Sequence, residues 1–257
     1  KIDRYKLLGE NGSAELGWLP FPPLMSNHGC YAGSLANVCR WLGREAEALG
    51  VEIYPGIAAS EVVYGEKGEV RGVVAGVMGI GADGQKKPDF EPGMELLGKY
   101  VLFAEGARGS LTKQLMSKFD LQADSDPQKF GIGLKEVWSV PEEIFVDGLV
   151  QHSFGWPVQD KDGNGGGFLY HFRDNGEPFV SVGYVVHLNY KNPYLAPYEE
   201  FQRYKHHPDI RRYLEGGKRV AYGARAITSG GLQSIPKLSF PGGALIGCCA
   251  GFVNLPR

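Results

Sequence analysis

The sequence has few cysteines, no long apolar run and nearly balanced charges. Only 4 of its 257 residues are cysteine, and the formal net charge is −2 at pH 7. No stretch approaches the roughly 18 consecutive apolar residues of a membrane-spanning helix. No basic excess indicates a nucleic acid partner. The remaining composition, 43% hydrophobic and 22% charged, is that of an ordinary globular protein.

Features of a complete gene product are also missing at both ends. The first residues, KIDRYKLLGENGS, contain no initiator methionine, no apolar core and no cleavage site, so they are not a signal peptide. The last residues, 254–257, come directly where a glycine turn would lead into a helix. We therefore expect an internal piece of a longer protein.

The spacing of the cysteines does not suit a metal site. Structural zinc and iron–sulfur sites use cysteine pairs two to four residues apart, whereas eight residues separate Cys30 from Cys39 and none separates Cys248 from Cys249. So few cysteines in so long a chain also argue against a disulfide framework. Cys30 and Cys39 are interpreted as small buried residues in a reduced compartment. We predict no metal ligand and no catalytic side chain.

Glycine, by contrast, is abundant: 38 residues, about twice the usual share of roughly 7%. The G-x-G-x-x-G pattern occurs at 79–84, but Pro88 and Pro92 prevent the helix that a dinucleotide site needs after it. This pattern is interpreted as a hairpin turn. The adjacent histidines His206 and His207 have no carboxylate or cysteine at ligand spacing and are interpreted as a surface pair.

Helices and strands are expected to alternate in the first half of the chain. Apolar residues at helical spacing predict a helix from Gly33–Ser34 to Gly50. A strand over 51–56, a hairpin over 59–81 that turns at 66–68, and a loop over 83–95 follow. A buried strand over 99–106 then leads into a helix over 109–119, for which Ser110 is the expected N-cap.

The second half has the pattern of an antiparallel sheet. Four strand-like runs, 131–140, 149–158, 166–174 and 177–188, are separated by turn residues. A helix over 198–214, kinked at Pro208, and strands over 218–227 and 242–249 follow. The simplest organisation is an α/β nucleotide-binding domain in two pieces, 26–129 and 220–257, with an antiparallel-sheet domain, 130–219, inserted between them.

Three glycine-containing segments are candidate ligand sites. In 103–110, a strand meets a helix start whose free backbone N–H groups, with Arg108, could bind an anion; the alternative is a plain strand–helix corner with a solvated arginine. In 240–254, an apolar strand runs into a small-residue turn that carries Cys248 and Cys249. The run 163–167 is either a wide hairpin connection or backbone exposed to an apolar ligand.

Several segments in order resemble the electron-transfer-flavoprotein–ubiquinone oxidoreductase family. The resemblance runs from about Ser26 to Arg257 and is carried by these stretches: NHGCYAGSLANVCRWLGREAEALGVEIYPG, FAEGARGSLTKQL, FGIGLKEVW, GWPV with GGGFLYHF, NPYLAPYEEFQRYKHHPDI, LEGGKRVAYGARAI and GGLQSIPKLSFPGGALIGCCAGFVN.

The resemblance implies a fold and a set of cofactors. The fold would be α/β (α+β), with a partial FAD-binding Rossmann-like domain of the glutathione-reductase type and an inserted antiparallel quinone-binding domain. The family passes electrons from reduced electron-transfer flavoprotein, through a [4Fe-4S] cluster and FAD, to ubiquinone. The amino-terminal G-x-G-x-x-G and the cluster cysteines are absent here, so the FAD site would be incomplete and the cluster would belong to the parent protein. The fragment alone would be inactive.

The resemblance also places site residues. FAD would contact two of the glycine-containing segments, 103–110 and 240–254, which we call the two glycine corners. In the first it would contact Gly106, Arg108 and Gly109, and in the second Gly247, Cys248, Gly251 and Phe252. Cys248 would take the place of an aspartate that related flavoproteins have, and Cys249 would be a packing residue. Gly165 and Gly166 would offer backbone groups to the quinone.

A monotopic membrane surface is a further implication, because ubiquinone is too apolar to reach its site through water. Residues 1–25 would be a membrane-surface segment, with Trp18, Phe21 and Leu24 at the interface, and the turn 154–156 is a second candidate. The location would be the bacterial cytoplasmic membrane or the mitochondrial inner membrane.

Two other functions are consistent with the same residues. One is a geranylgeranyl-reductase-like or nitrogen-fixation-associated flavoprotein that reduces a different acceptor. The other is a degenerate fragment, or a membrane-surface binding module without catalysis. The sequence beyond the carboxyl end would separate the first, and flavin absorbance of the full-length protein would separate the second.

Overall fold

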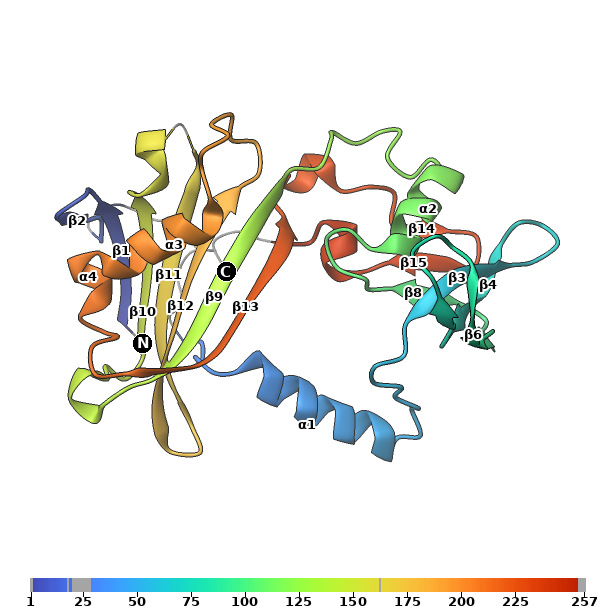
Figure 1. Cartoon of the computed structure of the whole chain (residues 1–257), viewed down its shortest axis with the longest axis horizontal. Helices are drawn as coiled ribbons and strands as arrows, with labels where there is room; N and C mark the ends of the chain where they lie inside the picture. The colour runs from blue at the N-terminus through green and yellow to red at the C-terminus, as the bar shows by residue number, and fades with distance from the viewer. Residues whose placement is uncertain (1, 18, 20–28, 162, 254–257) are drawn as a thin grey trace. The chain divides into compact units, whose positions relative to one another are not determined.

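The computed structural model describes residues 2–17, 19, 29–161 and 163–253, which form two compact units (Figure 1). Unit 1 comprises the described residues of 1–44 and 129–227, and unit 2 those of 45–128 and 228–254. Each unit has a hydrophobic core of its own. The predicted α/β class with an antiparallel sheet domain is confirmed.

Unit 1 is built on a mixed seven-stranded sheet. In spatial order its strands are β13 (Lys218–Thr228), β9 (Phe130–Ser139), β12 (Glu177–His187), β11 (Gly165–Asp174), β10 (Leu149–Gly155), β1 (Ile2–Leu8) and β2 (Ser13–Glu15). The parallel pair is β1 with β10. The four predicted antiparallel strands are present, and they occupy the centre of this sheet.

The boundaries of unit 1 differ from the predicted ones. Residues 2–8, expected in a membrane-surface segment, are strand β1 of the sheet, because they pair along their whole length with β10. Residues 220–227, expected in the nucleotide-binding domain, belong to β13 on the opposite edge. The assignment of each unit to a ligand stays a prediction.

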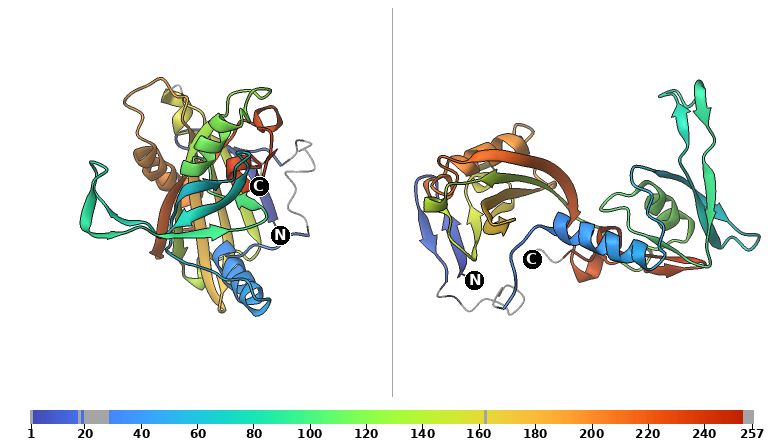
Figure 2. Two further views of the ribbon diagram at one scale, coloured as in Figure 1. Left: turned by 90° about the vertical axis from the view of Figure 1, so that its right-hand side faces the viewer. Right: turned by 90° about the horizontal axis from the view of Figure 1, so that it is seen from below.

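Two helices cover one face of this sheet, α3 (Pro197–His206) and α4 (Pro208–Arg211) (Figures 1 and 2). The expected single kinked helix is two helices, since Pro208 has no N–H to continue α3 and instead starts α4. His207, expected at the surface, is 1% exposed. Its Nδ1 accepts a hydrogen bond from the backbone N–H of Asp209 and thereby caps α4.

The helix-covered face of the sheet carries the core of unit 1. Alternation along the strands directs Leu149, Leu169, Val180 and Val182 to this face, and all four are at most 1% exposed. Phe201 of α3 packs onto them. The other face, which we call the open face, receives the residues in between.

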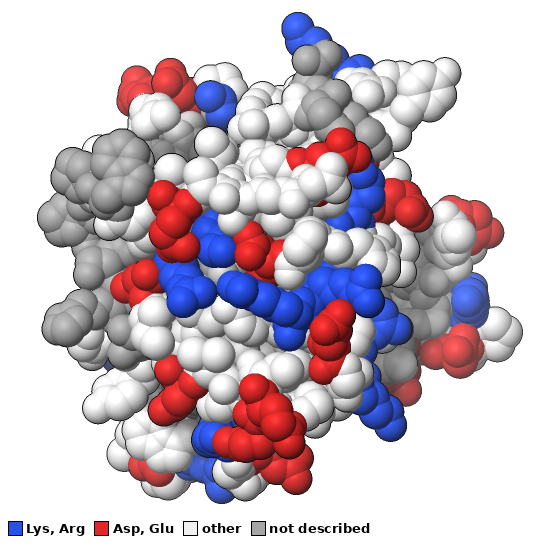
Figure 3. Space-filling view, turned by 90° about the vertical axis from the view of Figure 1, so that its left-hand side faces the viewer, with Lys and Arg blue, Asp and Glu red and all other residues white. Residues whose placement is uncertain are grey.

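Charged side chains of α4 form ion pairs with residues beside it. Lys6 lies 3.2 Å from Asp209, and Arg211 lies 3.0 Å from Glu215. In Figure 3, Lys and Arg form a band that is bordered by Asp and Glu. Mixed signs at this spacing give local ion pairs rather than a field of one sign.

Unit 2 contains three small sheets and the helix α2 (Ser110–Lys118). The first sheet is β3 (Ala59–Tyr64), β4 (Val70–Ala75) and β7 (Met94–Leu97), and the second is the hairpin of β5 (Met78–Ile80) and β6 (Lys86–Glu91). The third is β14 (Ser239–Phe240), β15 (Gly243–Leu245) and β8 (Val101–Phe103). Short 3-10 helices lie at Glu142–Ile144 and Val158–Lys161 in unit 1, and at Leu232–Ser234 and Gly247–Ala250 in unit 2.

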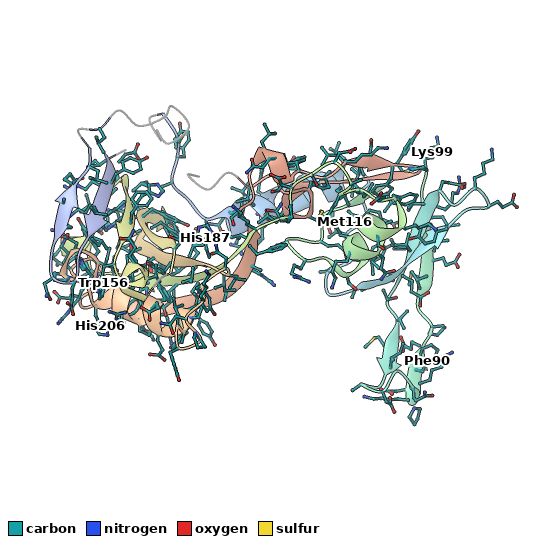
Figure 4. The ribbon with its side chains drawn as sticks, turned by 90° about the horizontal axis from the view of Figure 1, so that it is seen from above. Phe90, Lys99, Met116, Trp156, His187 and His206 are labelled. Carbon is teal, nitrogen blue, oxygen red and sulfur yellow. The ribbon has the colours of Figure 1, made fainter. Side chains whose placement is uncertain are left out.

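The hairpin predictions for unit 2 are confirmed. Strands β3 and β4 pair antiparallel around a turn in which Gly68 has φ +78°, a conformation that glycine adopts without strain. The G-x-G-x-x-G at 79–84 lies in the antiparallel β5–β6 hairpin, whose far strand carries Phe90 (Figure 4).

Three local predictions for unit 2 are wrong. Residues 51–56 are not a strand, because they turn at Pro55–Gly56. The expected loop over 83–95 contains β6 and part of β7; Pro88 is tolerated because β6 has one open edge. Ser110 is the first residue of α2, and the N-cap is Gly109.

Helix α1 (Leu35–Ala48) is present as predicted, but none of its residues is buried. The apolar stripe that predicted it includes Leu35 and Leu42, both exposed by more than half. Among the described residues, local sequence preference and not packing against a core therefore accounts for this helix.

Candidate functional site

The two glycine corners expected to contact FAD lie next to each other in unit 2. Strands β8 and β15 are parallel neighbours, with Leu245 opposite Phe103. The chain leaves both strands at the same edge of the sheet, which is where α/β folds place ligands. The backbone N–H of Ile246 donates to the carbonyl of Phe103 (2.9 Å) and holds the corners together. The structure thus brings together what the sequence places far apart.

The second corner is a tight turn with glycines at both ends. Gly247 and Gly251 have φ values of +66° and +81°, which only glycine adopts readily, and Gly247–Ala250 forms a 3-10 helix between them. Cys249 is buried, and its thiol lies 2.9 Å from the carbonyls of both Phe103 and Ile246, to either of which it can donate. Cys249 is therefore more than a packing residue, since it ties the turn to β8. Cys248 is half-buried.

The half-buried side chain of Gln128 contacts the residues around this turn. The Oε1 of Gln128 accepts from the backbone N–H of Gly230 (2.7 Å), and its Nε2 lies 3.4 Å from the carbonyl of Ser234. A Cβ on Gly251 would lie 3.0 Å from the same Nε2. Gly251 is thus confined both by its backbone angle and by Gln128.

At the first corner, the start of α2 is already occupied by a carboxylate of the chain itself. Glu105 accepts from the backbone N–H groups of Leu111 (3.2 Å) and Thr112 (2.6 Å), and from the Thr112 hydroxyl (2.6 Å). The prediction that free N–H groups at this helix start bind an anion is therefore wrong. Gly109 leaves room for the carboxylate, since a Cβ there would lie 2.3 Å from the Glu105 side chain.

What remains for a ligand at this corner is the turn ahead of the helix. Gly106 has φ +81° with nothing near its Cβ position, and the side chain of Arg108 is exposed. Phe252, after the second corner, is 50% exposed. Gly106, Arg108 and Phe252 are thus the groups at the two glycine corners that a flat or phosphate-bearing ligand could contact. At the start of α2 the ligand would instead meet the Glu105 carboxylate.

In unit 1, the glycine run opens strand β11, and each glycine has a different neighbour. A Cβ on Gly165 would lie 2.4 Å from the Val185 carbonyl, and a Cβ on Gly167 would lie 2.2 Å from the Tyr204 ring. Both point to the helix-covered face. Gly166 points to the open face, where its nearest neighbour would be the Ser153 carbonyl at 3.1 Å. Packing therefore accounts for Gly165 and Gly167, whereas the Cβ position of Gly166 is on the open face.

Beneath the run, a chain of hydrogen bonds holds the backbone of β11 in place. The Tyr204 and Ser153 hydroxyls are 2.7 Å apart, and Ser153 donates to the Gly167 carbonyl (3.3 Å). Burial raises the pKa of the Tyr204 phenol, so the phenol stays protonated and can donate to Ser153.

The open face around Gly166 is rich in aromatic rings, which sequence reasoning did not identify. Phe154 stands opposite Gly166, and Phe168 and Tyr170 follow on β11 with ring centroids 6.2 Å apart. Phe168 lies against Gly183, where a Cβ would be 2.2 Å from its ring. The period-two alternation of FLYHF and VQHSF could have indicated this face. It suits a flat apolar ligand.

A buried carboxylate links three elements of unit 1. Glu136 on β9 accepts from Lys205 of α3 (2.8 and 2.9 Å), Arg219 of β13 (3.1 Å) and the Trp138 indole (2.9 Å). Burial alone would raise the pKa of this carboxyl, but these donors together lower it. Sequence reasoning missed this cluster, because its members are far apart in the chain.

Of the residues predicted to lie at a membrane surface, Trp18, Phe21 and Leu24 are outside the described residues. Phe154 is 37% exposed, whereas the Trp156 ring packs against His207 (5.6 Å) and beneath the Arg203 guanidinium (5.1 Å). Among the described residues, no helix is long and apolar enough to cross a membrane.

In that same part of the chain, no group of three His, Cys, Asp or Glu side chains is arranged to hold a metal ion.

Comparison with known proteins identifies relatives over nearly the whole chain. Residues 130–227 match the family model described as ETF-QO, ubiquinone-binding. The mitochondrial electron transfer flavoprotein-ubiquinone oxidoreductase of Rattus norvegicus is 54% identical over 99% of this chain and 41% of its own length. The Pseudomonas aeruginosa enzyme of that name is 51% identical over 99% of this chain and 46% of its own. The chain thus spans less than half of these relatives.

Among solved structures, a tryptophan 6-halogenase from Streptomyces toxytricini is similar in fold. It has a TM-score of 0.51 and 15% identity, and the match covers 86% of this chain and 37% of the halogenase. At this identity the likeness concerns the fold alone. Along 99% of its residues, the chain is 51–54% identical to the matched part of electron transfer flavoprotein-ubiquinone oxidoreductases, and it contains the ubiquinone-binding domain of that family at 130–227.

Proposed function

We propose that the protein to which this chain belongs transfers electrons from reduced electron-transfer flavoprotein to ubiquinone. The observation that carries the proposal is Gly166. It faces the aromatic open face of the sheet, within the residues that match the ubiquinone-binding family model. The names of the relatives at 51–54% identity support the same activity.

We propose that FAD binds along the two glycine corners of unit 2. Gly106, Arg108 and Gly109 would line one side, and Gly247, Cys248, Gly251 and Phe252 the other. The positive φ angles of Gly106, Gly247 and Gly251 and the parallel β8–β15 pair support this placement. A bound flavin would supply two-electron redox chemistry. The chain's own part is to place the cofactor, through backbone groups that no side chain obstructs and a turn that Cys249 fixes.

We propose that the quinone contacts Gly165 and Gly166 through their backbone, with a division of labour between them. Gly165 is required for packing, since its Cβ would meet the Val185 carbonyl. Gly166 is the residue that allows a quinone oxygen to approach the strand. The flat ring would lie on the aromatic side chains of the open face, where offset stacking favours planar ligands.

Other parts of the parent enzyme would complete the electron path. The described residues do not fit a [4Fe-4S] cluster, since they hold no suitable group of ligands, so the cluster would bind elsewhere in the full-length protein. We propose a monotopic attachment through Trp18, Phe21 and Leu24 to the mitochondrial inner membrane or the bacterial cytoplasmic membrane, as the names of the mitochondrial and bacterial relatives suggest.

The experiment substitutes Gly166 in the full-length protein and measures reduction of ubiquinone-1. Gly166→Ala should raise the KM for ubiquinone-1 by roughly tenfold, equivalent to about 1.4 kcal/mol, and Gly166→Val should raise it further. The added methyl groups would occupy the place of the quinone oxygen, whereas the flavin content should not change.

The matched control is Gly223→Ala on β13 of the same sheet, where a Cβ would have nothing within 4 Å. This variant should keep the KM of the parent enzyme. Unchanged quinone kinetics in both Gly166 variants would refute the placement of the quinone.

A further inference from the structure

Two histidines lie on the open face on either side of Gly166. His152 of β10 is opposite Phe168, which is two residues along β11 from Gly166. His187 of β12 donates its backbone N–H to the Asn164 carbonyl (2.9 Å), two residues from Gly166 in the other direction (Figure 4). Diagonal neighbours of this kind have Cα atoms roughly 7–8 Å apart, within reach of long side chains and a bridging water.

The surroundings of His152 connect it to a carboxylate. Its ring stacks on Tyr5 of β1, with centroids 5.2 Å apart and planes at 12°. Asp3, two residues earlier on β1, points to the same face. The residue opposite His152 on β11, Phe168, carries no charge. The nearest titratable side chain on the same face of β11 is Tyr170, two residues further along. On its own strand the neighbours on this face are apolar.

Burial and charge act on this imidazole in opposite directions. Burial lowers the pKa of His152, and the negative charge of Asp3 offsets part of that effect. The neutral ring is therefore the resting form at neutral pH. Once protonated through Asp3, it is a stronger acid than imidazolium in water, as proton delivery to a weakly basic oxygen requires.

We propose that His152 is the proton donor for the quinone held at Gly166, with Asp3 as its link to solvent. This inference rests on the proposed function. Reduction of a quinone to a quinol takes two electrons, here from a reduced flavin, and two protons. One proton goes to the quinone oxygen at Gly166: the imidazolium N–H bond of His152 breaks and an O–H bond forms at that oxygen. The neutral imidazole then takes a proton from water by way of Asp3. The second proton, bound by the other quinone oxygen across the ring, comes from water.

His187 provides the comparison within the same sheet. It lies on the same face at the same diagonal spacing, but burial and the positive charge of Lys129 both lower its pKa. A neighbouring lysine opposes the formation of imidazolium, whereas Asp3 favours it beside His152. The position of Asp3 on the neighbouring strand, on the same face of the sheet, therefore favours His152 as the donor.

The test uses the full-length protein and the variants His152→Gln and His187→Gln. Stopped-flow reduction of ubiquinone-1 is compared with reduction of ferricyanide, which accepts one electron and no proton. We expect His152→Gln to slow quinol formation by roughly 10–100-fold, within or below the range of general acid catalysis. The Kd for ubiquinone-1 and the ferricyanide rate should change less than twofold. His187→Gln should match the parent in all three.

A second readout does not depend on turnover. In a ¹⁵N-histidine NMR titration of the full-length protein, ubiquinone-1 should shift the imidazole resonance that His152→Gln removes. A parent-like quinol rate in His152→Gln at every pH, or an equal loss with ferricyanide, would overturn the inference. If Gly166→Ala impairs quinone reduction and His152→Gln does not, only the proton route is wrong. If Gly166→Ala is also silent, the quinone site itself is misplaced.

Discussion

Glu136→Gln is expected to destabilise the sheet of unit 1 by about 3 kcal/mol, because it leaves the buried Lys205 ammonium and the partly exposed Arg219 without their anion. The parent carboxylate is almost fully buried and accepts from Lys205, Arg219 and Trp138, which come from three different elements. Its neutral replacement keeps the shape but can accept only through one oxygen. The Lys205 ammonium, itself 11% exposed, then loses its ion pair.

The measurement is hydrogen–deuterium exchange of the full-length protein, followed in peptides from β9 and β13. Their protection should fall by roughly 100-fold in Glu136→Gln, the equilibrium equivalent of about 3 kcal/mol. The control is Glu142→Gln, which breaks an exposed pair with Arg173 and should change protection little. Equal protection in the Glu136 variant and the parent would show that the cluster does not stabilise the sheet.

This contribution should also depend on pH. The pKa of Glu136 is lower in the folded chain than the ordinary value of 4.5. The unfolded chain therefore binds a proton more readily, and stability is lost as pH falls from about 4.5 through the folded pKa. The parent should show this loss of protection in acid, whereas Glu136→Gln should lack this part of the pH dependence.

Gly251→Val is expected to abolish flavin binding by the full-length protein. The residue has φ +81°, which is strained for a β-branched side chain, and its Cβ would lie 3.0 Å from the Gln128 amide. Relief of both constraints would open the Gly247–Gly251 turn that we propose as one wall of the flavin site. The ratio of absorbance at 450 nm to that at 280 nm in the purified protein should fall to the level of the apoprotein.

Backbone strain alone is controlled by a second glycine of unit 2. Gly84 has φ +79° and nothing within 4 Å of its Cβ position, at the tip of the β5–β6 hairpin. Gly84→Val should therefore carry similar strain but keep its flavin. A parent-like flavin content in Gly251→Val would contradict the placement, and a flavin loss in both variants would attribute the effect to general instability.

The sequence predicts the locally determined parts of this fold well. The β3–β4 hairpin follows from its alternation and Gly68, and the central antiparallel strands follow from their turn residues. Strand β1 could not be predicted in the same way, because IDRYKLL has no clean alternation and its partner β10 lies far along the chain. The loop expected over 83–95 was misjudged because Pro88 is compatible with an open strand edge.

The candidate sites show the same division. The family resemblance places Gly247 and Gly251 in a flavin turn, and both residues have the positive φ angles of a tight turn. The role of Glu105 could not be predicted, because a carboxylate that caps the following helix is known only once both are placed. The sequence likewise does not separate Gly165 from Gly166. Only the sheet register shows that their Cβ positions are on opposite faces.

The most direct test of the quinone site is photolabelling of the full-length protein with an azido-ubiquinone, followed by peptide mass spectrometry. We expect the label in β10 or β11, residues 149–174, on open-face side chains such as Phe154 and Phe168, and we expect excess ubiquinone-1 to compete it away. Competed labelling confined to peptides outside unit 1, with 149–174 unlabelled, would contradict the assignment of the open face around Gly166 as the ubiquinone site.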